Sequence, residues 1–299
     1  MKYLSVAETA KLWGVSARTV RNYCAEGKIL DAFQTGKTWN IPENAQRPER
    51  VNKRTEQPKN LLEFLKAEKD AGAKGGIYHK VQIELTYNSN HMEGSRLTHD
   101  QTRYIYETNT IGAEADPLNV DDILETANHF RCIDLVIEQA NQPLSERLIK
   151  DLHRTLKSGT SDSRKAWFAV GDYKKLPNEV GGQETAAPED VHLMLQELLC
   201  NYREKKSKTL EDLLEFHVNF ERIHPFQDGN GRVGRLLLFK ECLRNQIVPF
   251  IITEKLKLFY YRGLHEWNDE HGFLRDTCLT AQDQFKAYLD YFCIPYDKE

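Results

Sequence analysis

From residue 60 to its end, the sequence is a succession of helical periods with little that is typical of β-strands. In ten segments the apolar residues recur at steps of three and four, a spacing that places them on one face of an α-helix. The pattern predicts an all-α domain over residues 60–299. The ten predicted helices are 60–71, 78–93, 98–110, 120–139, 145–156, 189–205, 210–223, 231–245, 254–268 and 273–292.

One segment between these helices departs from the pattern. Residues 167–188, WFAVGDYKKLPNEVGGQETAAP, contain too much Gly and Pro for a helix. They predict a loop or a short hairpin.

Composition excludes several classes of protein. A chain of 299 residues with 40% hydrophobic and 29% charged residues is neither a disordered tail nor a collagen-like repeat. Its longest apolar run, Ile247 to Ile252, is interrupted by Pro249 and is far shorter than the roughly 18 residues that cross a bilayer. The N-terminus lacks the basic start and apolar core of a signal peptide. We therefore expect a cytoplasmic protein that does not span a membrane.

The net charge of −4 conceals a division near residue 60. Residues 1–59 contain eleven Lys and Arg against six Asp and Glu, whereas the rest of the chain contains 30 against 39. The stretch between the two parts, PENAQRPERVNKRTEQPKN, is polar and has no apolar period. We interpret it as a linker over residues 43–59, between a basic segment and an acidic domain.

The basic segment, residues 1–42, begins with two short predicted helices. Ser5 and Glu8 form a capping box before the first helix, and Ser16 can cap the second. Residues 28–42 then predict a β-hairpin around Thr35-Gly36-Lys37. This order resembles the winged helix-turn-helix domains of the MerR and excisionase type.

In that family the second helix enters the major groove of duplex DNA and the hairpin lies near phosphate. The resemblance implies DNA contacts by Arg18, Thr19, Arg21, Asn22 and Lys37. The same surface could instead bind a protein, since residues 1–42 are only mildly basic.

The sharpest motif is His224-Pro-Phe-Gln-Asp-Gly-Asn-Gly-Arg-Val-Gly-Arg235, between two predicted helices. A polar loop with two glycines that opens onto a helix suits an anion, because its backbone N–H groups and the helix dipole favour phosphate. Arg232 and Arg235 are three residues apart, so we expect both on one side of the helix. Asp228 suits a divalent cation, and His224 titrates near neutral pH as a proton acceptor should.

This motif is similar to the Fic family signature, HxFx(D/E)GNGRxxR, at all eight specified positions. The resemblance extends from about Tyr78 to Phe285 and implies the Fic helical bundle. Fic proteins typically transfer AMP from ATP to a protein hydroxyl. By resemblance, His224 would take the proton from the attacking Ser, Thr or Tyr, and Asp228 would hold Mg²⁺. The phosphates would be bound by Gly229, Asn230, Gly231, Arg232 and Arg235.

Two further features follow from the resemblance. Family members that phosphorylate carry Lys at the position of Gly231, so Gly231 favours AMP transfer. In AMP-transferring members a downstream helix lines the adenine pocket, which implies adenine contacts by Tyr261 and Asn268. The same spacing also fits an ordinary helix that faces the core.

An upstream motif, Ser89-Asn-His-Met-Glu93-Gly94, matches (S/T)xxxE(G/N), the inhibitory motif of class II Fic proteins. It lies at the end of the predicted helix 78–93. In the family this glutamate pairs with the second arginine of the signature, here Arg235, so that the γ-phosphate cannot seat productively. From the residues alone, we expect Ser89 to fix the helix end that aims Glu93, and Gly94 to let another backbone approach.

The Gly- and Pro-rich segment 167–188 falls where Fic proteins have a flap that pairs with the backbone of the target. This position implies target contacts by Leu176, Pro177 and Asn178. The alternative is a solvated loop without a role. The other histidines show no metal-binding spacing. Among them, His217 suits a position in the core or in contact with the site residues.

We therefore expect a protein adenylyltransferase that uses ATP and Mg²⁺ and is inhibited by its own Glu93. Its partner would be a protein that carries a target hydroxyl, and this protein could be a copy of the chain itself. The sequence does not decide whether the chain forms a homo-oligomer. One alternative is a hydrolase that removes AMP through the same site. Another is a DNA-binding regulator whose Fic domain senses nucleotide.

Overall fold

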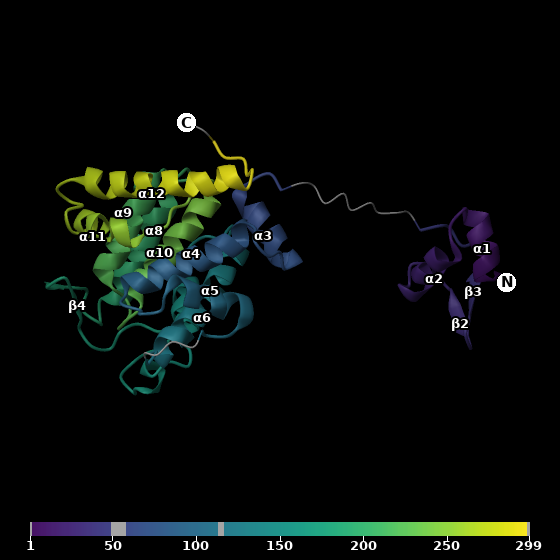
Figure 1. Cartoon of the computed structure of the whole chain (residues 1–299), viewed down its shortest axis with the longest axis horizontal. Coiled ribbons are helices and arrows are strands. Elements are labelled where there is room, and N and C mark those ends of the chain that lie inside the picture. Colours follow the sequence, from purple (N-terminus) through teal and green to yellow (C-terminus); the bar gives the residue numbers. More distant parts are fainter. Residues whose placement is uncertain (1, 49–57, 113–116, 298–299) are drawn as a thin grey trace. The chain divides into compact units, whose positions relative to one another are not determined.

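The chain divides into two units, Met1–Gln57 and Pro58–Glu299, in a computed structural model that describes residues 2–48, 58–112 and 117–297 (Figure 1). Much of the predicted linker, residues 49–57, lies outside the described residues. Its first residues belong structurally to unit 1, since Ala45 packs against the core of that unit and Arg47 Nη1 donates to the Trp13 carbonyl at 3.2 Å.

Unit 1 is built from two capped helices and a small antiparallel sheet. The Ser5–Glu8 capping box forms as predicted, and Gly14 ends the first helix in a left-handed conformation at φ 65°. The predicted hairpin is present, and a strand at the N-terminus, which the sequence did not indicate, adds to it in the order β1-β3-β2. The elements are β1 Tyr3–Leu4, α1 Val6–Trp13, α2 Ala17–Ala25, β2 Phe33–Thr35 and β3 Thr38–Pro42.

Unit 2 is a helical bundle, and each predicted helix is present within a few residues of its expected ends. Side chains of Asn60, Thr98, Ser145 and Thr209 cap four of the helix starts. The helices are α3 Leu61–Ala71, α4 Ile77–Met92, α5 His99–Thr108, α6 Val120–Glu138, α7 Glu146–Leu156, α8 Val191–Glu204, α9 Leu210–Ile223, α10 Asn230–Arg244, α11 Lys257–His265 and α12 His271–Tyr291, with 3₁₀ turns at Asp162–Arg164 and Glu254–Leu256.

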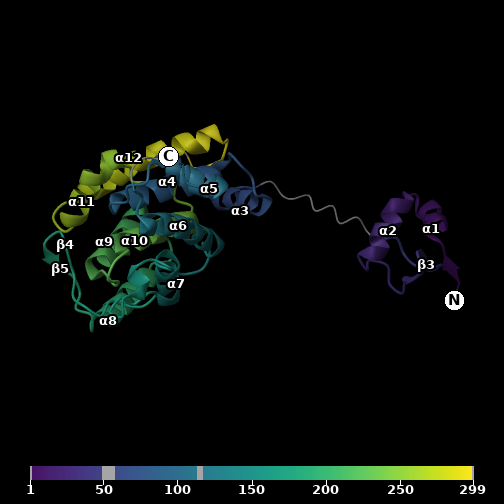
Figure 2. The same ribbon diagram turned by 60° about the horizontal axis from the view of Figure 1, so that its bottom comes forward.

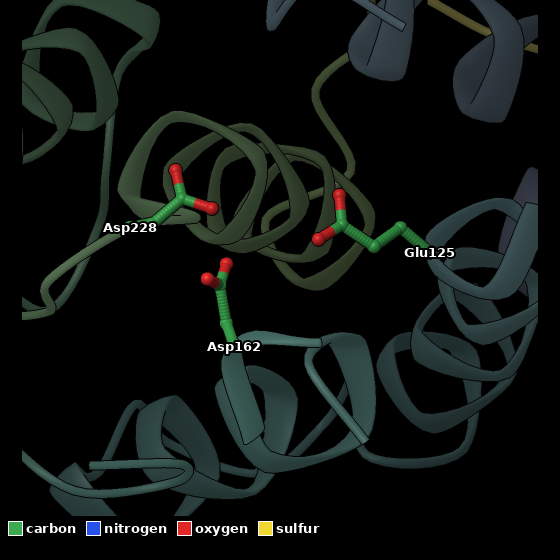
Figure 3. A group of neighbouring side chains, drawn as sticks. All are labelled: Glu125, Asp162 and Asp228. Atoms are coloured by element: carbon green, nitrogen blue, oxygen red, sulfur yellow. The ribbon is translucent and has the colours of Figure 1, made fainter. Parts of the chain in front are cut away.

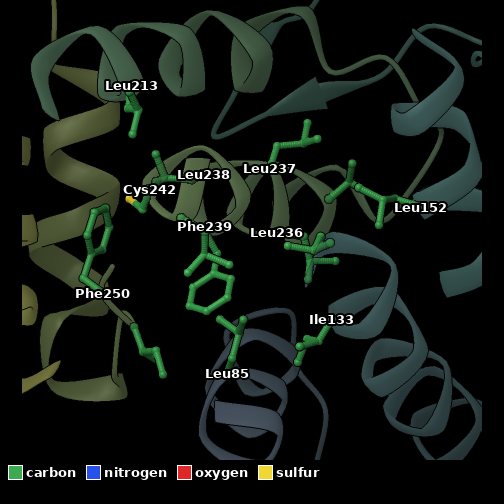
Figure 4. Close-up of a cluster of buried hydrophobic side chains, with 14 of the residues drawn as sticks. Leu85, Ile133, Leu152, Leu213, Leu236, Leu237, Leu238, Phe239, Cys242 and Phe250 are labelled. Atoms are coloured by element: carbon green, nitrogen blue, oxygen red, sulfur yellow. The ribbon is translucent and has the colours of Figure 1, made fainter. Parts of the chain in front are cut away.

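Helix α10 runs through the middle of this bundle (Figures 1 and 2). Almost every side chain from Val233 to Leu243 is buried, so the helix has no solvent face. Figure 4 shows Leu236, Leu237 and Phe239 of α10 directed toward surrounding helices, which contribute Leu85, Ile133, Leu152 and Leu213. Because α10 is fixed on all sides, its N-terminal end is a rigid support for the loop that precedes it.

One detail differs from the sequence-based expectation, and the segment 167–188 agrees with it. The predicted helix 254–268 is a 3₁₀ turn followed by α11, which ends at His265, so Asn268 does not share a helical face with Tyr261. The segment 167–188 is mostly irregular and contains one small hairpin, β4 Glu179–Val180 with β5 Gln183–Glu184. Within the described residues, no helix has the length and apolar character needed to cross a membrane.

Candidate active site

The loop between α9 and α10, residues 224–229, has a fixed shape. His224 ends α9 in the left-handed region at φ 51°, and Gly229, at φ 84°, precedes the first turn of α10. The buried Asn230 side chain accepts a hydrogen bond from the Phe226 N–H at 2.8 Å and donates one to the Phe226 carbonyl at 2.7 Å. Both ends of this amide therefore shape the loop, and the phosphate contact expected of Asn230 stays a prediction. The backbone N–H groups at the start of α10 still suit an anion.

His224 is oriented as a proton acceptor. Its Nδ1 lies 3.1 Å from the Glu221 carbonyl, which can only accept, so Nδ1 carries the proton and Nε2 keeps its lone pair. Burial lowers the pKa of His224, and the nearby Lys174 ammonium lowers it further, although the Glu221 carbonyl, Glu93 and Asp228 act in the opposite direction. The imidazole is therefore held neutral near pH 7, as a general base requires.

Asp228 belongs to a group of three carboxylates that point toward one another, with Glu125 and Asp162 (Figure 3). Their oxygens lie within 4.8 Å, a spacing that by itself would suit a metal ion. The position between them is already taken by the Lys157 ammonium, whose side chain is 2% exposed. Lys157 Nζ donates to Glu125, to Asp162 Oδ2 at 2.9 Å and to Asp228 Oδ2 at 2.7 Å.

Charge balance distinguishes Asp228 from the other two carboxylates. Arg232 also enters the cluster, donating to Glu125 and to Asp228 Oδ2 at 3.2 Å. Two cations thus face three carboxylates, which leaves one negative charge, and the Asp228 side chain is 48% exposed against 13% for Glu125. Burial alone would raise the pKa of Asp228, but Arg232 and Lys157 outweigh it and hold that pKa well below its usual range. Asp228 is therefore the ionised carboxylate that remains accessible to a cation.

The second arginine of the motif has different partners. Arg235, 7% exposed, donates from Nη2 to Glu93 Oε1 at 2.6 Å and to the Ser89 carbonyl at 3.0 Å. Its Nε donates to Ser89 Oγ at 3.0 Å, so Ser89 binds the arginine directly instead of only fixing the helix end. The two arginines, expected on one side of α10, are held by separate carboxylates: Arg235 by Glu93, directly after α4, and Arg232 by Glu125 of α6.

Glycines let these groups approach α10 closely. A Cβ added at Gly231 would overlap Oε1 of Glu93, and one added at Gly234 would overlap Oε1 of Glu221. Gly94, which we expected to admit a neighbouring backbone, has open space around it. Its left-handed φ of 94° explains the glycine there instead.

Of the two residues expected to contact adenine, Tyr261 lies near the site and Asn268 is bound elsewhere. Tyr261 lies on α11, is 38% exposed, and is close enough to Glu93 and Arg235 to interact with both charges. Asn268 lies beyond the end of α11, and its Oδ1 accepts a hydrogen bond from Arg222 Nη1 at 2.9 Å. The structure thus brings Tyr261 to the site, whereas the Asn268 amide is engaged on Arg222.

The expected flap lies against the loop formed by residues 224–229. Asn178 Nδ2 donates to the Phe226 carbonyl at 3.0 Å, and the Leu176 N–H donates to Gln227 Oε1 at 3.3 Å. Leu176 and Pro177 are exposed, as are the residues of β4 and β5. The segment that leads into the hairpin therefore lies against the loop that follows His224, and the residues of the hairpin itself are open to solvent.

In unit 1, the residues expected to contact DNA are mostly available. Arg18, Arg21 and Asn22 are exposed on α2, and Lys37 is exposed at the turn between β2 and β3. Thr19 is half-buried, and its backbone N–H and hydroxyl are both hydrogen-bonded to Ser16 Oγ.

Sequence reasoning missed the residues that surround the motif from α6 and α7. His153 stacks on Phe226 with ring centroids 3.9 Å apart, and its Nε2 lies 3.1 Å from the Asp228 carbonyl. Lys157 and Glu125 form the cluster described above. His153 and Lys157 are one helical turn apart, and this spacing of two polar groups at the buried end of α7 was the available signal.

Several known proteins resemble this chain in sequence or in fold. Residues 143–241 match the model of the Fic/DOC family. A protein named protein adenylyltransferase Fic from Drosophila melanogaster is 28% identical over 247 residues, which cover 76% of this chain and 48% of that protein. Its namesake from Nematostella vectensis is 27% identical over 216 residues, covering 70% and 49%. The chain thus spans about half the length of these curated relatives.

Among solved structures, a Fic domain containing signaling protein from Bacteroides thetaiotaomicron resembles this chain with a TM-score of 0.57 and 27% identity. The match covers 77% of this chain and 90% of the other. The mostly helical Fic fold is therefore the fold of unit 2, whose described residues contain one small sheet, β4-β5.

Proposed function

Since the chain contains a Fic/DOC family domain at residues 143–241, we propose that it transfers AMP from ATP to a Ser, Thr or Tyr hydroxyl of a protein. The observation that carries this proposal is the state of His224. Its Nδ1 is tied to a backbone carbonyl, so the free Nε2 lone pair stands beside a loop that suits phosphate. The relatives named protein adenylyltransferase support the same reaction.

In the proposed reaction, the target hydroxyl oxygen bonds to the α-phosphorus of ATP as its proton passes to His224 Nε2. The bond between the α-phosphorus and the oxygen that bridges to the β-phosphorus breaks, and pyrophosphate leaves. The N-terminal N–H groups of α10 face the charge that develops on the phosphates. A target segment paired with β4 or β5 would present its hydroxyl to His224 without strong dependence on its sequence.

The residues present fit a magnesium ion that accompanies ATP. Asp228 is ionised and half exposed, and carboxylate oxygen is a ligand that Mg²⁺ prefers. When bound there, the ion would neutralise charge on the phosphates. Glu125 and Asp162 would act differently, because they neutralise Lys157 and Arg232 and so leave Asp228 as the ligand.

We further propose that Glu93 inhibits the enzyme. The arginine expected to bind the γ-phosphate, Arg235, has its guanidinium on Glu93 and Ser89. While Glu93 holds this cation, the γ-phosphate has no partner there and the α-phosphate is not aligned for in-line attack. Gly231 supports the arrangement, since a side chain at that position would displace the Glu93 carboxylate.

The function is tested with α-labelled ATP, Mg²⁺ and the purified full chain, alone and with cell extract. His224→Ala should reduce the transfer of label to protein by roughly 10² or more while ATP binding persists. His271→Ala is the matched control, because His271 is an exposed histidine at the start of α12 that stacks on Trp267 outside the motif. If His224→Ala transferred label as fast as the wild type, the proposed role of His224 would be wrong.

For unit 1 we propose duplex DNA as the partner. The exposure of Arg18, Arg21 and Asn22 along α2, with Lys37 at a neighbouring turn, favours contacts to phosphates and base edges. A protein partner on the same surface is the alternative outcome.

A further inference from the structure

A buried lysine at the base of the flap has a role that the proposed reaction has not yet used. Lys174 is 3% exposed, and among the described residues no carboxylate pairs with it. Its Nζ donates instead to three neutral oxygens: Asn178 Oδ1 at 2.7 Å, Thr185 Oγ1 at 2.6 Å and the Ile223 carbonyl at 3.3 Å. Burying a cation without a counter-ion is unfavourable, so this position calls for an explanation. Burial lowers the pKa of Lys174 to about 8.

The contacts of Lys174 lie on both sides of His224. The ammonium binds the carbonyl of Ile223, the residue before His224, and the Lys174 N–H donates to the carbonyl of Pro225, the residue after it, at 2.9 Å. His224 itself has φ 51°, a left-handed conformation that is unfavourable for a residue other than glycine. Such a conformation persists only where the surroundings hold it.

The same ammonium also organises the flap. Asn178 and Thr185 stand at the two ends of the stretch that contains β4 and β5, and the Thr185 hydroxyl is itself bonded to Asn178. Lys174 therefore joins the base of the hairpin to the backbone that carries the catalytic histidine.

We propose that Lys174 is a positioning residue that holds the flap and His224 in one fixed register. The inference rests on the proposed AMP transfer, in which a target strand on the flap must place its hydroxyl at His224. A neutral side chain would bind the flap less firmly, whereas the ammonium bonds three oxygens at once from a single point. A displacement of about 1 Å at such a site can cost about 100-fold in rate.

Replacing Lys174 with methionine in the full chain should have two effects that do not depend on AMP transfer. The amides of Lys174, His224 and Thr185, which are hydrogen-bonded in the wild type, should exchange with deuterium faster. The titration midpoint of His224, followed by NMR of labelled histidine, should move to higher pH. The other charged groups that face His224, Glu93 and Asp228, remain unchanged, so the loss of the Lys174 charge is the cause.

The matched control is Lys175→Met, because Lys175 is the next residue and is exposed. It should change neither the exchange nor the midpoint. Lys174→Arg keeps the charge and should restore the His224 midpoint and part of the protection. If Lys174→Met does not fold, Thr185→Val removes one acceptor and should speed exchange of the hairpin amides to a smaller extent.

In a label-transfer assay, Lys174→Met should lower the rate of transfer to protein at least 10-fold and leave the KM for ATP unchanged. Unchanged amide exchange, or a His224 midpoint that does not move, would overturn the proposal. These two readouts do not require activity, so they judge Lys174 even if His224→Ala disproves AMP transfer.

Discussion

Replacement of Glu93 is the most direct test of inhibition. Glu93→Gly removes the carboxylate that lies 2.6 Å from Arg235 Nη2, while the two contacts of Arg235 with Ser89 remain. The guanidinium is then held near its present position but lacks a counter-ion. We expect it to accept the γ-phosphate of ATP, so that AMP transfer rises.

The size of the effect follows from the contact that is lost. A hydrogen bond between charged partners contributes about 1.5–3 kcal/mol, and both side chains here are largely buried, Arg235 at 7% and Glu93 at 27% exposure. If about 2 kcal/mol of this opposes productive binding of ATP, its removal corresponds to a rate increase of roughly 30-fold. Without nucleotide the variant should be less stable than the wild type, because the Arg235 charge is left buried without a counter-ion.

Two assays follow from this reasoning. Self-modification with α-labelled ATP measures transfer, and the rise in Tm on adding ATP and Mg²⁺ measures binding. The variant should gain more in Tm than the wild type, since ATP supplies the missing counter-charge. Because glycine also loosens the helix end, Glu93→Ala and Glu93→Gln are needed as controls; all three remove the charge and only one adds flexibility.

Inhibition by Glu93 would be refuted if all three variants transferred AMP at the wild-type rate. Simply additive effects of Glu93→Gly and Arg235→Ala would have the same meaning, because residues in direct contact should be coupled. Ser89→Ala should raise transfer less than Glu93→Gly, since it removes only one of the hydrogen bonds to Arg235. If AMP removal is the physiological reaction, Glu93→Gly should lose that hydrolysis as it gains transfer.

Three further predictions concern charges elsewhere in the chain. Lys157→Met leaves three clustered carboxylates without their ammonium, so the free energy of unfolding should fall by about 3 kcal/mol, and millimolar Mg²⁺ should restore more stability to the variant than to the wild type; equal stability of the two proteins in denaturant would contradict this. Burial lowers the pKa of His129, His153 and His217 to about 3. Near neutral pH these histidines bind protons only when the chain unfolds, so the free energy of unfolding should fall as pH drops from about 6.5. The fall is at most about 4 kcal/mol per pH unit for three protons. Denaturation curves that coincide at pH 7 and pH 5 would disprove this effect. Residues 1–59 should retard duplex DNA in a salt-dependent manner that Arg21→Ala weakens, and no retardation at low salt would favour a protein partner.

Much of the architecture could be predicted from local sequence. Helices form where apolar residues recur at the helical period. N-cap side chains such as Ser5, Thr98 and Thr209 mark the residue at which a helix begins. Segment 254–268 is an exception, because apolar periodicity alone did not predict where its helix ends. Periodicity continued past His265, but the helix ends there, so Asn268 lies outside the face on which its spacing had placed it.

The motif from His224 to Arg235 could likewise be recognised from the sequence. Its polar residues and glycines have chemical properties that suit phosphate binding or proton transfer. The sequence alone could not assign those residues their partners. The polar side chain of Asn230 was expected to contact phosphate. In the structure its amide group is hydrogen-bonded to the backbone of Phe226. Arg232 and Arg235 are equivalent by spacing, but one binds Glu125 and the other Glu93.

The sequence by itself thus determined the helices, many of their caps and the loop between α9 and α10, since each depends on residues a few positions apart. Tertiary structure decided which charges meet. Glu93 and Arg235 are 142 positions apart, and Lys174 lies 49 positions from the Ile223 carbonyl that it binds. A buried ion finds its partner through the packing of whole helices, and no local periodicity records that packing.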